Sequence, residues 1–233
     1  MHAQPRPPVL LTRPAAQSAR FAAQMQARFG PLEVVISPLM APVFLRPDLP
    51  AGPFDAVIFT SETGVAAARA AGWALPGLAV CVGDRTAAAA TEAGFAARSA
   101  GGDAEALVAM LRAGSGAGRL LHLRAAEARG DVAARLTAAG FPTDEAVVYD
   151  QRPAPLSEAA RALLAGDRAV VVPLFSPRSA ALLAVAARGC PAPLWVAAFS
   201  PAVAAGIAAA RMVVAARPEA IALLEALEMF LGG

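Results

Sequence analysis

The stretch from Phe54 to Phe95, FDAVIFTSETGVAAARAAGWALPGLAVCVGDRTAAAATEAGF, decides the fold because a second stretch repeats its pattern. The second stretch, from Ala169 to Ala210, reads AVVVPLFSPRSAALLAVAARGCPAPLWVAAFSPAVAAGIAAA. Each starts with an apolar β-branched run that ends beside an aromatic residue and a serine, Ser61 or Ser176. In each stretch, this strand is followed by a helix, a second strand and a second Ala-rich helix. A third short strand and a helix with an acidic cap come after them. The repeat therefore predicts two similar α/β domains.

Outside the repeat, short β-branched runs alternate with Ala-rich stretches in the same way. Several runs are apolar on both faces, as at 57–59 and 170–172, which is typical of parallel strands covered by helices on both sides. The predicted fold class is therefore α/β, with two parallel-sheet domains. The predicted strands are 9–12, 33–37, 55–60, 78–82, 119–123, 145–149, 169–175, 194–199 and 212–215.

Three helices are predicted from apolar spacing and capping residues. Apolar residues recur every four positions at 21, 25 and 29, and every three or four positions near the end of the chain at 221, 224, 227 and 231. Asp103 precedes a helical pattern that ends at Leu111, and aspartate is a favoured N-cap residue. We therefore expect Asp103 to begin that helix.

Two proline-rich stretches interrupt the alternation of strands and helices. Residues 38–53 read PLMAPVFLRPDLPAGP and residues 150–155 read DQRPAP. Proline disfavours helix at its own position and at the one before it, so both stretches are expected to be extended. Because they enclose one repeat, the chain is predicted to leave one domain, build the second and return. The opening strand, helix and strand then join the domain that contains the second repeat.

The charged residues exclude two classes of chemistry. All 20 basic side chains are Arg, which against 18 acidic side chains gives a net charge of +2. Without lysine, neither a Schiff base nor a phosphate loop ending in Gly-Lys-Ser/Thr can form. The longest charge-free run, between Arg188 and Arg211, contains three prolines, so no membrane span is expected. Residues 1–8 contain no apolar signal core, and two distant cysteines favour a reducing compartment, so a cytoplasmic location is predicted.

Small hydroxyl or glycine residues with a nearby Arg recur where predicted strands end and helices begin. In an open parallel sheet this edge binds ligands, and helix N-termini attract anions. Each position alone is more typical of helix capping, but their recurrence in both repeats favours an anionic small-molecule ligand. The candidate binding residues are Thr12, Arg13, Ser61, Thr63, Gly64, Gly83, Thr86, Arg124, Ser176 and Ser179.

Tyr149, the one tyrosine of the chain, ends a predicted strand in AVVYDQRPAP. It is either a sheet-edge aromatic with its hydroxyl in water or a proton donor in the site. His122 lies inside a predicted strand, where a single histidine is more often structural than catalytic. No Gly-x-Gly-x-x-Gly follows the first strand, and no set of metal ligands is spaced for a metal site, so none is expected.

Together these residues resemble the uroporphyrinogen-III synthase family, whose motifs occur here in the family's order over nearly the whole chain. No single motif is decisive, but their order and spacing together are fairly specific. The motifs are VLLTRP at 9–14, DAVIFTSETGV at 55–65, VGDRTAAAATEAG at 82–94, LHLRAAEARGDVAARLTAAGF at 121–141, VVYDQRP at 147–153 and LFSPRSA at 174–180.

The resemblance implies a particular domain organisation and activity. A discontinuous domain of residues 1–37 and 154–233 would be joined to a domain of residues 48–145 by connector strands at 38–47 and 146–153. The family consists of lyases that close the linear tetrapyrrole hydroxymethylbilane, with loss of water and inversion of ring D, in haem, chlorophyll and cobalamin biosynthesis. It implies no cofactor, a monomer, and no nucleic-acid or membrane partner.

By the same resemblance, Tyr149 would assist departure of the hydroxymethyl oxygen. The candidate binding residues would hold the eight carboxylates of the substrate, with Arg13 and Arg124 adding charge. Two positions depart from the family pattern, because Ala202 stands where Thr is expected and Ala125 where Gly is expected. Two other functions remain open. One is a non-catalytic two-lobed binding module for an anionic small molecule. The other is a nucleotide-sugar transferase, against which the absence of a glycine-rich nucleotide-binding turn argues.

Overall fold

The computed structural model describes residues 6–114, 118–127 and 130–232. It divides into two compact units, one built from residues 1–41 and 153–233 and the other from residues 42–152. The predicted fold class is confirmed: each unit contains a parallel sheet with helices on both faces. The domain boundaries predicted from the sequence stay a prediction. Residues 1–5, which entered the prediction of no export signal, lie outside the described part.

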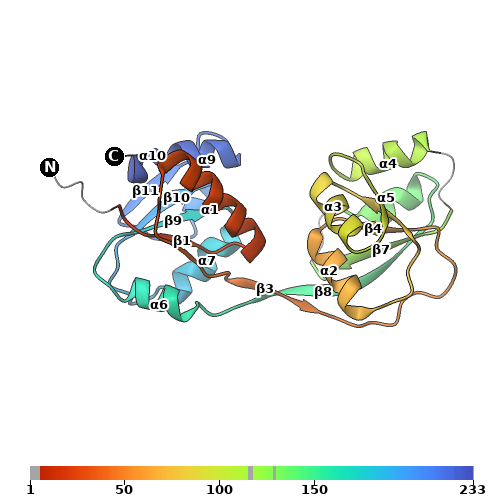
Figure 1. Ribbon diagram of the computed structural model, residues 1–233, viewed down its shortest axis with the longest axis horizontal. Coiled ribbons are helices and arrows are strands. Elements are labelled where there is room, and N and C mark those ends of the chain that lie inside the picture. The colour runs from red at the N-terminus through yellow and green to blue at the C-terminus, as the bar shows by residue number, and fades with distance from the viewer. Residues whose placement is uncertain (1–5, 115–117, 128–129, 233) are drawn as a thin grey trace. The chain divides into compact units, whose positions relative to one another are not determined.

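The discontinuous unit, called unit 1 below, contains the parallel sheet β11-β10-β9-β1-β2 among its described residues (Figure 1). The opening strands β1 and β2 thus lie in the same sheet as the strands of the second repeat. In chain order its elements are β1 Val9–Leu11, α1 Ala15–Phe29, β2 Val34–Ile36, α6 Glu158–Leu164, β9 Val170–Leu174, α7 Pro177–Ala186, β10 Leu194–Ala198, α8 Pro201–Ala204, β11 Arg211–Val214, α9 Ala220–Ala226 and α10 Glu228–Leu231.

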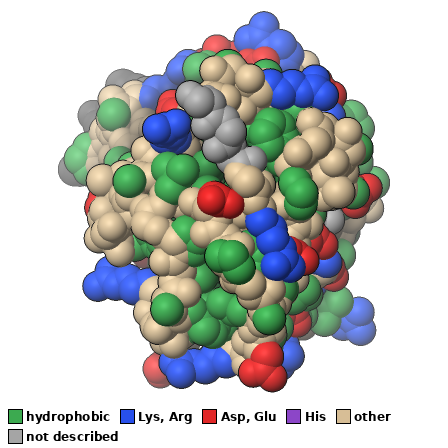
Figure 2. Space-filling view, turned by 90° about the vertical axis from the view of Figure 1, so that its right-hand side faces the viewer, with side chains coloured by type: hydrophobic (Ala, Val, Ile, Leu, Met, Phe, Trp, Pro, Cys, Tyr) green, Lys and Arg blue, Asp and Glu red, His purple; other side chains and the backbone are tan. Residues whose placement is uncertain are grey.

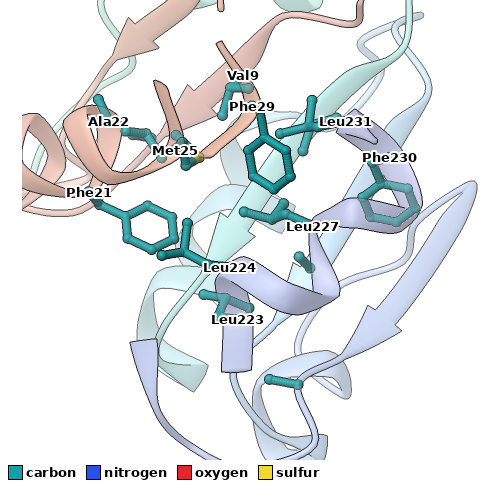
Figure 3. Packing of buried hydrophobic residues seen from close by; sticks show 14 of the residues in the cluster. Val9, Phe21, Ala22, Met25, Phe29, Leu223, Leu224, Leu227, Phe230 and Leu231 are labelled. Carbon is teal, nitrogen blue, oxygen red and sulfur yellow. The ribbon is translucent and has the colours of Figure 1, made fainter. Parts of the chain in front are cut away.

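The sheet of unit 1 buries apolar side chains on both faces, as its two-sided apolar strands require. On one face, α1 presents Phe21, Met25 and Phe29 to the C-terminal helices α9 and α10 (Figure 3). On the other face, α6, α7 and α8 pack against alternate residues of the same strands. The predicted C-terminal helix is divided into α9 and α10, and Ile221 at its start is 63% exposed rather than in the core.

The continuous unit, called unit 2 below, contains the sheet β3-β8-β7-β4-β5-β6 within the described residues. The strands β8, β7, β4, β5 and β6 run parallel to one another. Helices α2 and α3 cover one face, called the α2 face below, and α4 and α5 cover the other. In chain order the elements are β3 Met40–Phe44, β4 Ala56–Phe59, α2 Glu62–Ala71, β5 Leu78–Cys81, α3 Asp84–Glu92, β6 Ala96–Ser99, α4 Ala104–Ala113, β7 Leu120–Ala125, α5 Val132–Ala138 and β8 Thr143–Pro153.

The two proline-rich stretches pair with each other. The Leu45 N–H donates to the Val148 carbonyl, and the Ala154 N–H donates to the Leu39 carbonyl, both at 2.9 Å. Partner numbers fall as residue numbers rise, so β3 and β8 run antiparallel. β8 extends well beyond the predicted 145–149, because its second half continues as the partner of β3. Asp103 begins α4 as predicted and accepts hydrogen bonds from the N–H groups of Glu105 and Ala106.

The two sheets are the same arrangement with a permuted chain order. The strands β6-β5-β4-β7-β8 occupy the positions of β11-β10-β9-β1-β2, so the repeat extends to β1 and β2. Register fixes the equivalent residues on the strands that flank β9 and β4. In unit 1, Val9 pairs with Val171, which lies five residues before Ser176. In unit 2, Leu120 pairs with Ala56, which lies five residues before Ser61, so Val9 and Leu120 are equivalent. Counting on along β1 and β7, Leu11 is equivalent to His122 and Arg13 to Arg124.

Charged side chains are dispersed on the face that Figure 2 shows, where Arg and acidic groups alternate with apolar and neutral ones and form no continuous basic patch. No helix in the described ranges has the length and apolar character that a membrane crossing requires.

Candidate functional site

Ser61 links the end of β4 to the start of α2. Its backbone is extended, and its hydroxyl oxygen accepts a hydrogen bond from the Gly64 N–H at 3.1 Å, which caps the helix. A Cβ atom on Gly64 would lie 3.2 Å from the Leu123 carbonyl oxygen of β7. Glycine thus lets the first turn of α2 approach the end of the neighbouring strand. Since Gly64 donates to Ser61, its N–H serves the cap, and its predicted role in substrate binding stays a prediction.

Tyr149 contacts this cap directly. Its hydroxyl lies 2.7 Å from the Ser61 hydroxyl, and either oxygen can be the donor. The tyrosine is only 6% exposed and packs in the core under α2 and α3. The structure therefore disagrees with the reading of Tyr149 as a sheet-edge residue whose hydroxyl is in water. Ser61 and Tyr149, 88 positions apart in the chain, form a pair of linked hydroxyls at the carboxyl end of the sheet.

A β-bulge in β8 explains why Tyr149 is directed at Ser61. Arg124 pairs with Val147, but the next residue of β7, Ala125, pairs with Tyr149. Two steps along β8 thus match one step along β7, and Val148 is the extra residue. Val148 and Tyr149 consequently both pack in the core of the α2 face, where strict alternation would have put them on opposite faces.

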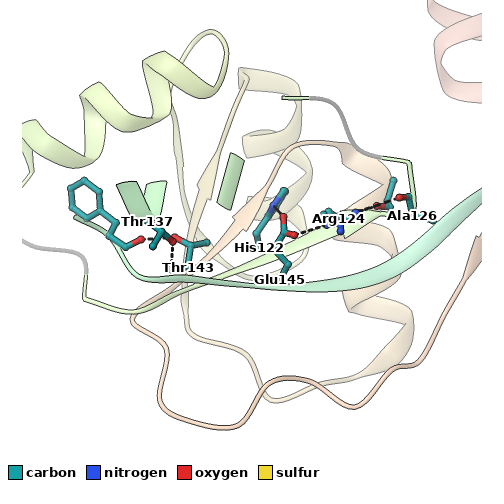
Figure 4. Close-up of polar contacts among 8 residues, drawn as sticks. His122, Arg124, Ala126, Thr137, Thr143 and Glu145 are labelled. Atoms are coloured by element: carbon teal, nitrogen blue, oxygen red, sulfur yellow. Dashed lines mark hydrogen bonds and ion pairs between the residues drawn. The ribbon is translucent and has the colours of Figure 1, made fainter. Parts of the chain in front are cut away.

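On the opposite face of the sheet, His122 and Glu145 pair across β7 and β8 (Figure 4). His122 Nδ1 lies 3.2 Å from a Glu145 carboxylate oxygen, and His122 is 1% exposed. Burial lowers the pKa of His122; the hydrogen bond and charge of Glu145 oppose this effect, and the charge of Arg124 adds to it. The imidazole is therefore neutral at neutral pH.

Arg124 is held by groups of its own unit. Its Nε lies 3.0 Å from the other Glu145 oxygen, and its Nη1 donates to the carbonyls of Ala125 and Ala126 at 2.9 and 3.3 Å. The predicted contact of Arg124 with substrate is not tested by these bonds and stays a prediction. Sequence reasoning missed Glu145, although the parallel pairing of β7 with β8 would have placed it opposite His122.

The equivalent residues of unit 1 repeat the capping geometry. Ser176 begins α7 with an extended backbone, and its hydroxyl oxygen accepts from the Ser179 N–H at 3.1 Å, the distance found at Ser61. Where Ser61 meets Tyr149, the Ser176 hydroxyl donates to the Ser179 hydroxyl at 2.9 Å. The Arg13 guanidinium lies over the Phe175 ring, 3.9 Å from its centre.

The remaining predicted residues lie at the same sheet edges. Thr12 follows β1, and its buried hydroxyl has no hydrogen-bond partner among the described residues. Gly83 is the N-cap of α3 and offers that helix no side-chain acceptor, while Thr86 is buried in its first turn. Thr63 is half-buried in the first turn of α2. Thr12, Arg13, Ser176 and Ser179 thus belong to unit 1, and the other predicted residues belong to unit 2.

No group of three or more His, Cys, Asp or Glu side chains is placed to hold a metal ion in the ranges that the structure describes. The two cysteines are free, Cys81 buried and Cys190 half-buried.

Comparison with known proteins identifies the family. The family model described as "Uroporphyrinogen-III synthase HemD" matches residues 20–225. The chain is similar to the uroporphyrinogen-III synthetase structure from Helicobacter pylori, with 18% identity over 94% of this chain and 97% of that one and a TM-score of 0.62. A mutant uroporphyrinogen III synthase from the extremely thermophilic bacterium Thermus thermophilus aligns over 97% of this chain and 99% of that one, with 16% identity and a TM-score of 0.46. No curated protein matches the chain.

The similarity to the Helicobacter pylori structure supports the two-domain parallel-sheet fold described above. The family model spans nearly all of the described chain and includes Tyr149, Ser61 and both capped helix starts. The chain belongs to the uroporphyrinogen-III synthase family, and it is a lyase of tetrapyrrole biosynthesis.

Proposed function

We propose that the chain closes hydroxymethylbilane with Tyr149 assisting the departure of the hydroxymethyl oxygen. The observation that carries the proposal is the 2.7 Å contact between the Tyr149 and Ser61 hydroxyls. Ser61 accepts from the Gly64 N–H, so its own proton can point to the tyrosine oxygen. The phenol proton then points away from Ser61, toward a bound substrate.

In this arrangement each oxygen accepts a hydrogen bond from behind and donates one forward, and such chains strengthen every bond along them. The substrate oxygen takes the phenol proton as the carbon–oxygen bond breaks, so it leaves as water. The proton that the substrate loses when the ring closes restores the phenol. Tyr149 thus acts as a general acid, and Ser61 fixes the direction of its proton.

The candidate binding residues would hold the carboxylates of the substrate. Free N–H groups in the first turn of a helix and the positive end of its dipole favour anions. The start of α3 fits this role, since Gly83 gives it no side-chain cap. Arg13 fits it as well, because guanidinium pairs bidentately with carboxylate. The proposed set is Thr12, Arg13, Ser61, Thr63, Gly64, Gly83, Thr86, Ser176 and Ser179. Arg124, the remaining residue indicated by the sequence, is left out because its guanidinium is engaged by Glu145 and two carbonyls of its own unit.

The activity itself is tested by supplying freshly generated hydroxymethylbilane and measuring the ratio of type III to type I uroporphyrinogen. The synthase gives type III. Formation of only the spontaneous type I isomer, with retained binding of the bilane, would instead support a two-lobed binding module.

The role of Tyr149 is tested by Tyr149→Phe, which removes one oxygen and keeps the buried ring. We expect kcat to fall about a hundredfold or more, the usual contribution of a general acid, with little change in KM. Ser61→Ala keeps the phenol but not its orientation, so its effect should be smaller. Full turnover by Tyr149→Phe would contradict the proposal.

The binding role of Arg13 has a separate readout. Arg13→Ala should raise KM more than it lowers kcat, because it removes attraction for a carboxylate that is present before and during the reaction. An unchanged KM would exclude Arg13 from substrate binding.

We further propose that the protein is a cytoplasmic monomer. Two free cysteines suit a reducing compartment. Sedimentation equilibrium at micromolar concentration should give the mass of one chain, 23.5 kDa. A concentration-dependent mass would contradict the monomer.

A further inference from the structure

We infer that Arg124 is a positioning residue for Tyr149: its guanidinium fixes the β-bulge that turns the tyrosine toward Ser61. The inference rests on the proposed function only for its consequence for kcat. The position of the Tyr149 side chain is measured separately, by NMR. It assigns to Arg124 a different role from the substrate contact that its place at a strand end suggested.

The bulge needs something to hold it, because it interrupts the regular ladder between β7 and β8. If β8 alternated strictly and had no bulge at Val148, Tyr149 would lie on the face opposite Ala146 and Val148, away from α2. A slip of one residue in this register would therefore remove the phenol from Ser61.

The contacts of Arg124 connect both sides of the bulge. Its Nε lies 3.0 Å from Glu145, which precedes the bulge on β8. Its Nη1 donates to the carbonyls of Ala125 and Ala126, where β7 passes the bulge. The Ala126 N–H in turn donates to the Tyr149 carbonyl at 2.9 Å. The Arg124 guanidinium thus contacts Glu145, before the bulge, and Ala126, whose N–H binds the Tyr149 carbonyl after the bulge.

Glu145 is itself held by the buried His122. With the imidazole neutral, its Nδ1–H donates to one carboxylate oxygen, while the Arg124 guanidinium forms an ion pair with the other, its Nε lying 3.0 Å away. The carboxylate is therefore fixed from two directions (Figure 4). A hydrogen bond to an ionised acceptor, such as that from His122 to Glu145, is stronger than one between neutral groups.

Unit 1 supplies an internal comparison. Arg13 occupies the position equivalent to Arg124, but the residues equivalent to His122 and Glu145 are Leu11 and Ile36, which pair in the corresponding register. At these equivalent positions, the acid and the histidine thus occur in unit 2, which contains the tyrosine, and apolar residues occur in unit 1. Arg13 lies against Phe175 instead. The two equivalent arginines therefore serve different purposes, Arg13 in substrate binding and Arg124 in positioning.

Because the chain contains one tyrosine, labelling with ¹³C-ring tyrosine gives an NMR signal from Tyr149 alone. The signal is compared in wild type, Arg124→Ala and Arg124→Lys, together with kcat and KM. Ser61→Ala supplies the shift that accompanies loss of the hydroxyl partner. Arg119→Ala is the matched control, since Arg119, which directly precedes β7, pairs with Asp144 of β8 at 2.7 Å, at the opposite end of β7 from the bulge.

We expect Arg124→Ala to shift or broaden the tyrosine signal and to lower kcat about tenfold to a hundredfold, with KM nearly unchanged, since small misplacements of a catalytic group have effects of this size. Arg124→Lys keeps the charge without the planar fork, so it should restore only part of kcat and keep the variant folded if the alanine does not. Arg119→Ala should cost stability and leave the signal in place.

A tyrosine signal unmoved in both Arg124 variants, with a raised KM, would overturn the inference and make Arg124 a substrate contact. A shifted signal in the Arg124 variants together with full turnover of Tyr149→Phe would uphold the positioning role and reject the catalytic one. The two proposals thus fail on different measurements.

Discussion

At the scale of single residues, burial decides what the titratable groups can do. His122 and Cys81 are both nearly inaccessible to water, and burial disfavours the charged form of each. The histidine is therefore kept neutral and the thiol protonated. The Tyr149 hydroxyl, which we propose to be reactive, is instead placed by its 2.7 Å contact with the Ser61 hydroxyl.

His122 makes stability depend on pH. Its pKa in the folded protein lies below the ordinary value of 6.5, so between those two values the unfolded chain binds more protons. The free energy of unfolding should therefore fall as pH decreases through this window, by at most about 1.4 kcal/mol per pH unit. Urea unfolding at pH 8, 6.5 and 5 should show a smaller decrease for His122→Gln. The difference in unfolding free energy between the two proteins at pH 8 gives the effect of the substitution on stability when the histidine is neutral. If the unfolding free energies of both proteins depended equally on pH, the prediction would be wrong.

At the scale of elements, the helix starts and strand ends carry the site. Ser61 and Ser176 begin α2 and α7 with the same geometry, although they lie in different units. What differs is the strand beside them: β8 carries a bulge that brings the Tyr149 hydroxyl to the Ser61 cap, whereas the described pairing of β1 with β2 has no such shift of register. If Tyr149 acts as proposed, the two repeats differ in function through one strand and not through the helices.

The two cysteines differ in how far their surroundings protect them from reagents in solution. Burial in β5 raises the pKa of the Cys81 thiol to about 11, whereas Cys190 is half-buried after α7. A thiol reagent at pH 8 should therefore modify Cys190 quickly and Cys81 only as unit 2 opens, because the thiolate is the reactive form. Cys190→Ser should abolish the fast phase. Fast modification of both thiols would show that β5 does not protect Cys81.

At the scale of the whole molecule, each unit has its own core. The clusters on both faces of each sheet draw their side chains from one unit alone. Each unit also contains one tryptophan: Trp195 packs against the core of unit 1 and Trp73 against that of unit 2. The two units can therefore be followed separately by fluorescence.

Leu223→Ala in the core of unit 1 should lower the stability of that unit by about 2–5 kcal/mol. In a Trp73→Phe background, urea unfolding followed by Trp195 should shift to lower urea. In a Trp195→Phe background, the Trp73 transition should stay in place. Leu121→Ala, buried in unit 2, is the matched control and should do the reverse. Equal shifts of both transitions would show that the units unfold as one.

The sequence by itself determined the repeat, the parallel α/β class and the residues at the strand ends, because two-sided apolar runs, N-cap residues and prolines act through local sterics and periodicity. The proline-rich stretches predicted where the chain passes between units. Capping of α4 by Asp103 and of α2 and α7 by serines also followed from local rules.

Only the tertiary structure decided which of these residues meet. The contact of Tyr149 with Ser61 depends on a bulge, and a one-residue change of register reverses the face of every side chain beyond it. No local pattern around VVYDQRP encodes that extra residue. The pairing of His122, Glu145 and Arg124, and the equivalence of Arg124 with Arg13, likewise depend on strand order and register, which long-range packing sets.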